Sequence, residues 1–193
     1  MRVVVIENVT LDGVMQSPAR ADEDPRDGFV RGGWAVPYND AVMGEQMGRR
    51  MAAGGAGLLL GRRTYEDFYA VWPNRTDNPY TEVLNRTRKY VASRTLTEPL
   101  PWENSTLLGG DAADAVARLR EEPGANLTVL GSGALVRALA GRGLVDEYLL
   151  LIHPLVLGTG HRLFDGAPPM PLRLDDSVTT TTGVIIATYH PAR

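Results

Sequence analysis

Cysteine is absent from this chain of 193 residues. Disulfide bonds, thiolate catalysis and zinc sites built on cysteine are therefore excluded. Histidine is scarce, with three residues scattered along the chain, so we expect no metal site. No apolar run is long enough to cross a bilayer, and the chain starts directly with a strand-like run instead of a basic segment followed by a long apolar one. We therefore expect no membrane association and a cytoplasmic location.

Blocks of lysine and arginine are also missing. The 20 basic and 23 acidic residues give a net charge of −3, and no basic cluster offers a surface for nucleic acid or an anionic membrane. We therefore expect a small molecule as the partner. The length, with 44% hydrophobic and 22% charged residues, fits one domain or at most two small ones. Because no linker divides the chain, we expect a single domain spanning residues 1–193.

Strand-like and helix-like segments alternate along the chain. Short β-branched or leucine-rich runs predict strands, and segments with apolar residues on one face predict helices. The expected strands are residues 2–6, 58–60, 89–92, 106–108, 126–130, 147–152, 172–178 and 184–189. The expected helices begin near Asp40, Thr64, Tyr80, Asp111 and Ala134, and the first of them ends near Ala53, before Gly54 and Gly55. This order predicts a three-layer α/β fold with a largely parallel central sheet, helices on both faces and antiparallel strands at the C-terminal end.

Residues 58–66 carry the first candidate site. Three leucines predict a short buried strand, Gly61 breaks it, and a helix follows near Thr64. A helix N-terminus leaves backbone N–H groups unpaired and carries a partial positive charge, so it binds anions. The adjacent Arg62 and Arg63 add charge in a geometry suited to phosphate. The alternative is an ordinary strand–helix corner with solvated arginines.

A second corner of the same kind follows Leu130. Gly131 and Gly133 flank Ser132, and Ala134 opens the next helix. Glycine lets a ligand approach the backbone closely, although tight packing at the turn explains it equally well. The pattern is not a Rossmann fingerprint, because its third glycine is missing. Two such corners at the carboxyl ends of neighbouring parallel strands would hold one dinucleotide between them.

Residues 15–38 form a long stretch without periodicity, rich in glycine, proline and charge. Loops of this length in a compact domain are usually functional or disordered. We interpret this one as a lid or pocket wall, and we predict that residues 16–33 are mobile without ligand and order over the site. Trp34 either covers a substrate ring or anchors the loop. Asp40, which follows, is either a substrate-facing catalytic acid or the N-cap of the next helix.

Seven short motifs, in this order, resemble the dihydrofolate reductase-like superfamily. The resemblance is closest to the reductase domain of the bifunctional riboflavin-biosynthesis deaminase–reductase and its free-standing bacterial relatives. The motifs are residues 10–13, 60–66, 91–94, 129–133, 145–148, 152–158 and 163–164. Each is weak alone, but the ordered set covers nearly the whole chain. The zinc motif of the deaminase is missing, so the resemblance extends to the reductase half only.

The resemblance implies NADPH as cofactor and assigns residues to it. Its phosphates would lie at Gly61, Arg62, Arg63 and Thr64, its 2′-phosphate at Ser93 and Arg94, and its pyrophosphate along Leu130, Gly131, Ser132, Gly133, Ala134 and Leu135. We expect NADPH to bind better than NADH, with Arg94 and Arg62 as the discriminating residues. The chain departs from dihydrofolate reductases at Ala134 and Val136, where they usually carry arginine and tyrosine. Their pterin-binding acid has only Asp40 as a counterpart, so folate reduction is not expected.

The sequence thus predicts an NADPH-dependent reductase of a small heterocyclic substrate, resembling the riboflavin-pathway reductase domain and acting by hydride transfer. The alternative is a non-catalytic NADP(H)- or nucleotide-binding protein. The tail places the apolar residues 184–187 next to threonines at 179–182. If these strands form an uncovered sheet edge, a second copy would cover it, and we therefore expect a homodimer.

Overall fold

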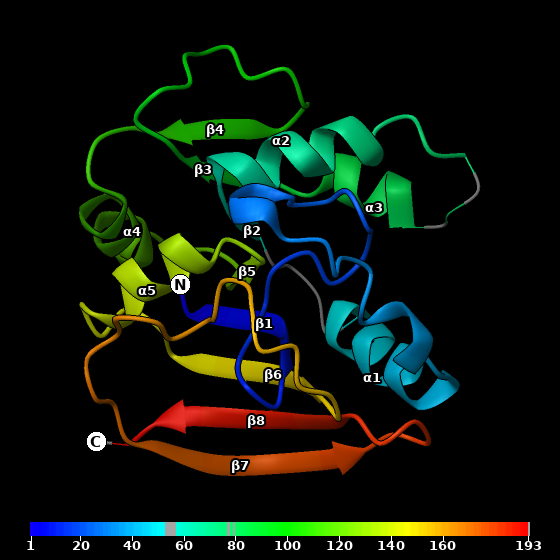
Figure 1. Cartoon of the computed structure of the whole chain (residues 1–193). Helices are drawn as coiled ribbons and strands as arrows, with labels where there is room; N and C mark the ends of the chain where they lie inside the picture. The colour runs from blue at the N-terminus through cyan, green and yellow to red at the C-terminus, as the bar shows by residue number, and fades with distance from the viewer. Residues whose placement is uncertain (53–56, 77, 79, 193) are drawn as a thin grey trace.

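An eight-stranded sheet in the order β4-β3-β2-β5-β1-β6-β8-β7 runs through the molecule (Figure 1). The computed structural model describes residues 1–52, 57–76, 78 and 80–192. The strands are β1 (Val3–Thr10), β2 (Gly57–Gly61), β3 (Lys89–Ala92), β4 (Ser105–Leu108), β5 (Leu127–Leu130), β6 (Glu147–His153), β7 (Leu172–Thr179) and β8 (Ile185–Pro191). The helices are α1 (Ala41–Ala52), α2 (Arg62–Val71), α3 (Tyr80–Arg86), α4 (Ala112–Glu121) and α5 (Gly133–Ala140), with short 3₁₀ turns at Arg26–Gly28 and Val36–Tyr38.

The first six strands pair in parallel, and the last two are antiparallel additions. β1 lies between β5 and β6, and β2 lies between β5 and β3. β8 pairs antiparallel with both β6 and β7. The predicted fold class is therefore confirmed, and so are the antiparallel C-terminal strands.

Alternating residues of the central strands pack against helices on both faces of the sheet. Val3 and Val5 of β1 are completely buried in a cluster that contains residues of α4 and α5. Leu58 and Leu60 of β2 pack on the opposite face against α2 and α3, and Ile6 packs there against a cluster that includes Met43 of α1. A parallel strand buried on both faces needs such a continuous apolar run, which explains why the sequence predicts these strands well.

Two helix N-caps are formed by the aspartates that precede the helices. Asp111 accepts a hydrogen bond from the backbone N–H of Asp114 at 3.0 Å, and Asp40 accepts one from Met43 at 2.8 Å. Each carboxylate satisfies an N–H group that the helix itself leaves unpaired. The predicted C-terminal end of α1 at Gly54 and Gly55 lies outside the described residues.

The C-terminal strands form one edge of the sheet, with β7 outermost. The apolar residues Ile186 and Ala187 lie in β8, which is the second strand from the edge and is paired on both sides. The outermost strand is β7, which is mostly exposed, carries the charged residues Asp175 and Asp176, and is irregular between Leu174 and Asp176. Charges and irregularities of this kind discourage edge-to-edge pairing. The tail strands therefore do form one edge of the sheet, but the apolar residues lie in β8, inside the outermost strand β7.

None of the helices in the described part of the chain combines the length and the apolar character that crossing a membrane requires.

Candidate cofactor-binding site

The two predicted corners lie side by side and are hydrogen-bonded to each other. β2 and β5 pair in parallel, so their carboxyl ends reach the same edge of the sheet. The Ser132 hydroxyl oxygen accepts a hydrogen bond from the backbone N–H of Gly61 at 2.9 Å and donates one to Thr64 Oγ1, also at 2.9 Å. The expectation of neighbouring corners on parallel strands is confirmed, and one serine side chain joins them into a single site.

The glycine turn needs its glycine for a steric reason. Gly131 and Ser132 both adopt left-handed backbone conformations, with φ of 58° and 63°. A Cβ atom on Gly131 would lie 3.2 Å from Thr64 Cγ2, closer than ordinary van der Waals contact. The turn is therefore packed directly against the first corner.

Both helices at this edge begin without a side-chain cap. Gly61 precedes α2 and has no side chain to cap it, and the side chain of Ser132, which precedes α5, forms no cap hydrogen bond. In the first turn of a helix most backbone N–H groups have no partner within the helix, and the helix dipole adds partial positive charge there. In α5 the N–H group of Leu135 is an exception, because it donates to the carbonyl oxygen of Ser132 at 2.7 Å. α2 starts at Arg62, slightly earlier than the predicted start near Thr64, so both arginines belong to its first turn. This arrangement can bind an anionic group between the two helices.

The three predicted arginines differ in how they are used. The Arg62 Nη1 atom lies 2.8 Å from Glu66 Oε2, one turn along α2, in a partly exposed ion pair. Arg63 is exposed, and Arg94 is exposed just beyond β3, where Ala92 pairs with Gly61. In the described part of the chain, neither Arg63 nor Arg94 forms an ion pair. These two side chains are therefore the ones available for a ligand.

Ser93 shapes the segment that carries Arg94. Its hydroxyl oxygen accepts hydrogen bonds from the backbone N–H groups of Thr95, at 3.1 Å, and Leu96, at 3.0 Å. The side chain is thus used to form the turn after β3. This turn sets the position of Arg94 relative to the first corner.

The long loop after β1 is held in place by internal hydrogen bonds. Gln16 donates to the carbonyl oxygens of Asp24 and Arg26, and its own side-chain oxygen accepts from the backbone of His161. Arg20 forms an ion pair with Asp67 of α2 at 2.5 Å. The loop therefore docks on the helix that begins at the first corner (Figure 1). Its mobility without ligand stays a prediction.

Trp34 and Asp40 both have structural partners. The Trp34 indole N–H donates to the carbonyl oxygen of Gln16 at 2.7 Å, and its ring packs edge-on against His153. The second carboxylate oxygen of Asp40 accepts hydrogen bonds from the backbone and hydroxyl of Thr181, at 2.7 and 2.6 Å. Asp40 thus joins α1 to the β7–β8 turn, and the hydrogen bond from Thr181 holds the pKa of its carboxyl below the usual range. Among the described residues, neither Trp34 nor Asp40 forms a hydrogen bond or ring contact with the two corners.

One buried acid at the carboxyl edge was missed by the sequence reasoning. Glu7 of β1 is only 4% exposed, and its Oε1 atom has no hydrogen-bond partner among the described residues. Burial raises the pKa of Glu7 well above its ordinary value, and the nearby charge of Glu23 adds to this effect. The available signal was a glutamate directly after the apolar run 3–6, at a position that continues the buried alternation of Val3 and Val5.

A buried histidine on the neighbouring strand has a lowered pKa. His153 ends β6, and its Nε2 atom lies 2.8 Å from Asn8 Oδ1. Burial lowers the pKa of His153 to about 4, so the ring is neutral near pH 7. With Trp34 and Tyr38 packed edge-on against it, the ring fits a structural role.

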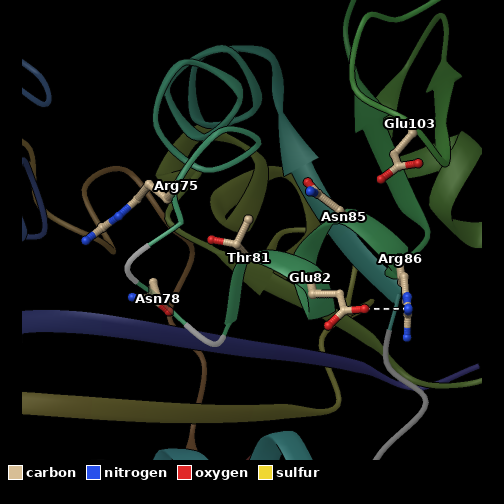
Figure 2. Close-up of a pocket in the computed structure, with 7 residues that line it drawn as sticks. All are labelled: Arg75, Asn78, Thr81, Glu82, Asn85, Arg86 and Glu103. Atoms are coloured by element: carbon tan, nitrogen blue, oxygen red, sulfur yellow. Dashed lines mark ion pairs between the residues drawn. The ribbon is translucent and has the colours of Figure 1, made fainter.

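Two cavities lined by described residues lie away from this edge. Figure 2 shows the first, of about 420 Å³, which is lined by Arg75, Asn78, Thr81, Glu82, Asn85, Arg86 and Glu103. Of its two acids, Glu82 and Glu103, Glu82 is already paired with Arg86. The second, of about 530 Å³, includes Met1, Gly57 and Leu127 at the amino ends of the strands. Ligands of open α/β sheets bind beyond the carboxyl ends of the strands, so we base the candidate site on the two corners.

The family model described as the RibD C-terminal domain matches residues 2–186. The chain belongs to this family. The protein YyaP of Bacillus subtilis, described as uncharacterized, is 31% identical over 140 residues, covering 69% of this chain and 72% of YyaP. A second uncharacterized protein of that organism, YwjB, is 30% identical over 107 residues, covering 55% of this chain and 57% of YwjB.

Three solved structures share the fold of this RibD C-terminal domain and cover the whole chain. A putative riboflavin biosynthesis protein from Shewanella sp. PV-4 has a TM-score of 0.70 at 23% identity, with all of that chain covered. A pyrimidine reductase-like protein from Corynebacterium diphtheriae has a TM-score of 0.65 at 13% sequence identity, with 92% of that chain covered. Dihydrofolate reductase from Enterococcus faecalis, in complex with NADP(H) and RAB-propyl, has a TM-score of 0.59 at 12% sequence identity, with 97% of that chain covered. The predicted superfamily is confirmed, and the family supports a reductase-type role.

Proposed function

We propose that this protein is an NADPH-dependent reductase of a small heterocyclic substrate. The observation that carries the proposal is the bridge made by Ser132 to Gly61 and Thr64, which unites two uncapped helix N-termini at one edge of the sheet. Two adjacent anion sites of this kind match the pyrophosphate of a dinucleotide. Membership in the RibD C-terminal domain family and a fold shared with an NADP(H)-bound dihydrofolate reductase support the choice of cofactor.

The residues present fit the cofactor group by group. The pyrophosphate would lie along the turn from Leu130 to Leu135, where a side chain on Gly131 would be crowded by Thr64. The 2′-phosphate would bind Arg63 and Arg94, which are free of ion pairs within the described residues, while Arg62 shares its charge with Glu66. Bound NADPH would supply the hydride. The chain would orient the cofactor, and the loop that is held to α2 by the ion pair between Arg20 and Asp67 would exclude water from the site.

A non-catalytic NADP(H)-binding protein remains the second candidate function. Both carboxylate oxygens of Asp40, the predicted catalytic acid, are already engaged with Met43 and Thr181. A protein that kept the cofactor corners without an acid facing the substrate would bind NADPH and reduce nothing. Oxidation of NADPH in the presence of candidate heterocycles separates this candidate from the reductase.

Titration calorimetry with NADPH and NADH tests the cofactor assignment. A charge-assisted hydrogen bond contributes about 1.5–3 kcal/mol, so Arg94→Ala and Arg63→Ala should each weaken NADPH binding roughly ten- to a hundredfold. NADH affinity should barely change, because NADH lacks the 2′-phosphate. Arg62→Ala should have the smallest effect of the three, since Arg62 is already paired with Glu66.

The matched control is Arg49→Ala, which removes an exposed arginine of α1 that pairs with Glu45 away from both corners. It should leave both affinities unchanged. Equal losses for NADPH and NADH in Arg94→Ala and Arg63→Ala would show that these arginines do not read the 2′-phosphate. Failure of the wild-type protein to bind either dinucleotide would overturn the proposed function.

A further inference from the structure

Glu7 stands where the central strand β1 meets the glycine turn. β5 ends at Leu130, which pairs with Ile6, so Glu7 is the first residue of β1 beyond the end of its neighbour. On its other side Glu7 pairs with Leu150 of β6. The backbone of Gly131 lies near its carboxyl and acts to lower the pKa of Glu7, against the larger effect of burial. The acid therefore lies beside the turn that the proposed function assigns to the cofactor.

Within the described residues, no cation pairs with this acid and one of its two carboxyl oxygens is left without a partner. The Oε1 atom of Glu7 has no hydrogen-bond partner among the described residues, although the side chain is buried. The same sheet contains a second buried glutamate, Glu147, and that one is paired with both Arg2 and Arg50. In the described part of the chain, Glu7 forms no ion pair, and the charge that acts on it is another acid, Glu23.

An apolar residue would serve the core better at this position. The preceding and following inward residues of β1 are Val5 and Val9, both buried in the core that α4 and α5 cover. Burying a carboxyl without a cation or a full set of hydrogen bonds is costly, and the group responds by staying neutral. An acid of this kind beside a cofactor-type turn is a candidate for ligand contact.

A neutral carboxyl offers one O–H donor and one C=O acceptor side by side. The complementary group is an amide edge, in which a carbonyl acceptor and an N–H donor are also adjacent. We propose that Glu7, as a neutral acid, binds the amide edge of the molecule held at this site. The inference rests on the proposed function. The edge comes either from the nicotinamide carboxamide of the cofactor or from a cyclic amide of the substrate ring.

Two substitutions of Glu7 separate the effect of its carboxyl on ligand binding from its effect on the stability of the fold. Glu7→Gln keeps an adjacent donor and acceptor and should bind ligands almost as the wild-type protein does. Glu7→Leu matches the apolar neighbours and should raise the melting temperature, since it removes a buried unpaired acid. It should also weaken binding of the amide-bearing ligand roughly tenfold or more, because two hydrogen bonds are lost.

Three ligands in titration calorimetry identify the source of the amide. They are NADPH, its 3-acetylpyridine analogue, in which a methyl group replaces the amide nitrogen, and uracil as a free ring with a cyclic amide. A loss in Glu7→Leu for NADPH but not for the analogue assigns Glu7 to the carboxamide. A loss for uracil alone assigns it to the substrate. Glu147→Gln, as control, should lower stability and leave all three affinities unchanged.

The outcomes that overturn the inference differ from those that overturn the proposed function. Equal binding by Glu7→Leu and the wild-type protein, for NADPH and uracil alike, would refute the role of Glu7 alone. A loss in Glu7→Gln as large as in Glu7→Leu would refute pairing through a neutral acid. If the wild-type protein binds neither NADPH nor uracil, the proposed function fails and this inference fails with it.

Discussion

Single residues make the candidate site, and their roles were predictable to different degrees. Ser132 stood in a Gly-Ser-Gly pattern that fitted tight packing as well as ligand binding. Only the structure shows that its hydroxyl joins Gly61 to Thr64. A contact between residues about seventy positions apart leaves no local signal in the sequence. Glu7 was overlooked for a different reason, because one polar residue at the end of an apolar run reads as the end of a strand.

Substitutions of Asp40 test whether this residue has a structural role or the predicted catalytic one. Asp40→Ala should lower the urea midpoint of unfolding, because both the cap of α1 and the bonds to Thr181 are lost. Asp40→Asn should lower it less, since asparagine is an equally good cap. Urea unfolding of the two variants and the wild-type protein checks this order.

The lowered pKa of Asp40 predicts that the stability difference between the wild-type protein and Asp40→Asn depends on pH. The pKa of Asp40 in the folded protein lies below its ordinary value of 3.8, chiefly because of the hydrogen bond from Thr181. Its charge therefore stabilises the fold fully above that value, and the contribution disappears as the pH falls through the folded-state pKa. The gap between wild type and Asp40→Asn should shrink on acidification below about pH 4. A gap that does not change with pH, or no loss in Asp40→Ala, would reopen the catalytic hypothesis.

At the scale of elements, the sequence predicts where the strands and helices lie along the chain, but not which strands are neighbours in the sheet. The leucines at 58–60 and the run from Val3 predict buried strands because continuous apolar side chains need two covered faces. The tail also reads as two strands, but nothing in residues 184–187 tells which strand lies outside. That order depends on β8 pairing with β6 across a long connection. The sequence therefore predicts two tail strands without identifying which of them forms the edge.

The packing of the glycine turn against the first corner predicts different effects for two glycines. Gly131 and Gly143 both have positive φ, 58° and 64°. A Cβ atom would lie within 4 Å of Thr64 at Gly131, whereas at Gly143 it would meet open space. Gly131→Ala and Gly143→Ala should each lose about 1–2 kcal/mol of unfolding free energy from backbone strain. Only Gly131→Ala should also weaken NADPH binding, because the methyl group pushes the two corners apart.

Urea unfolding and calorimetry on the same two variants check this expectation, with Gly143→Ala as the matched control for strain. Equal NADPH affinity in both variants would mean that the fit between Gly131 and Thr64 has no part in binding. Weaker binding in Gly143→Ala would point to a general loss of stability as the cause.

For the whole molecule, the order of the strands brings the site together. β2 and β5 are far apart in the sequence, yet they pair directly and bring both helix N-termini to one edge (Figure 1). The homodimer stays a prediction, and the apolar tail no longer supports it because β8 is covered on both sides. Sedimentation at micromolar concentration would decide it.

The central claim is that the two corners form one NADPH site, and amide chemical shifts in a titration test it most directly. On addition of NADPH to ¹⁵N-labelled protein, the amides of Arg62, Arg63 and Thr64 and those from Gly131 to Leu135 should shift together and yield one dissociation constant. Shifts confined to one corner, or to the residues around the cavity of Figure 2, would contradict the claim.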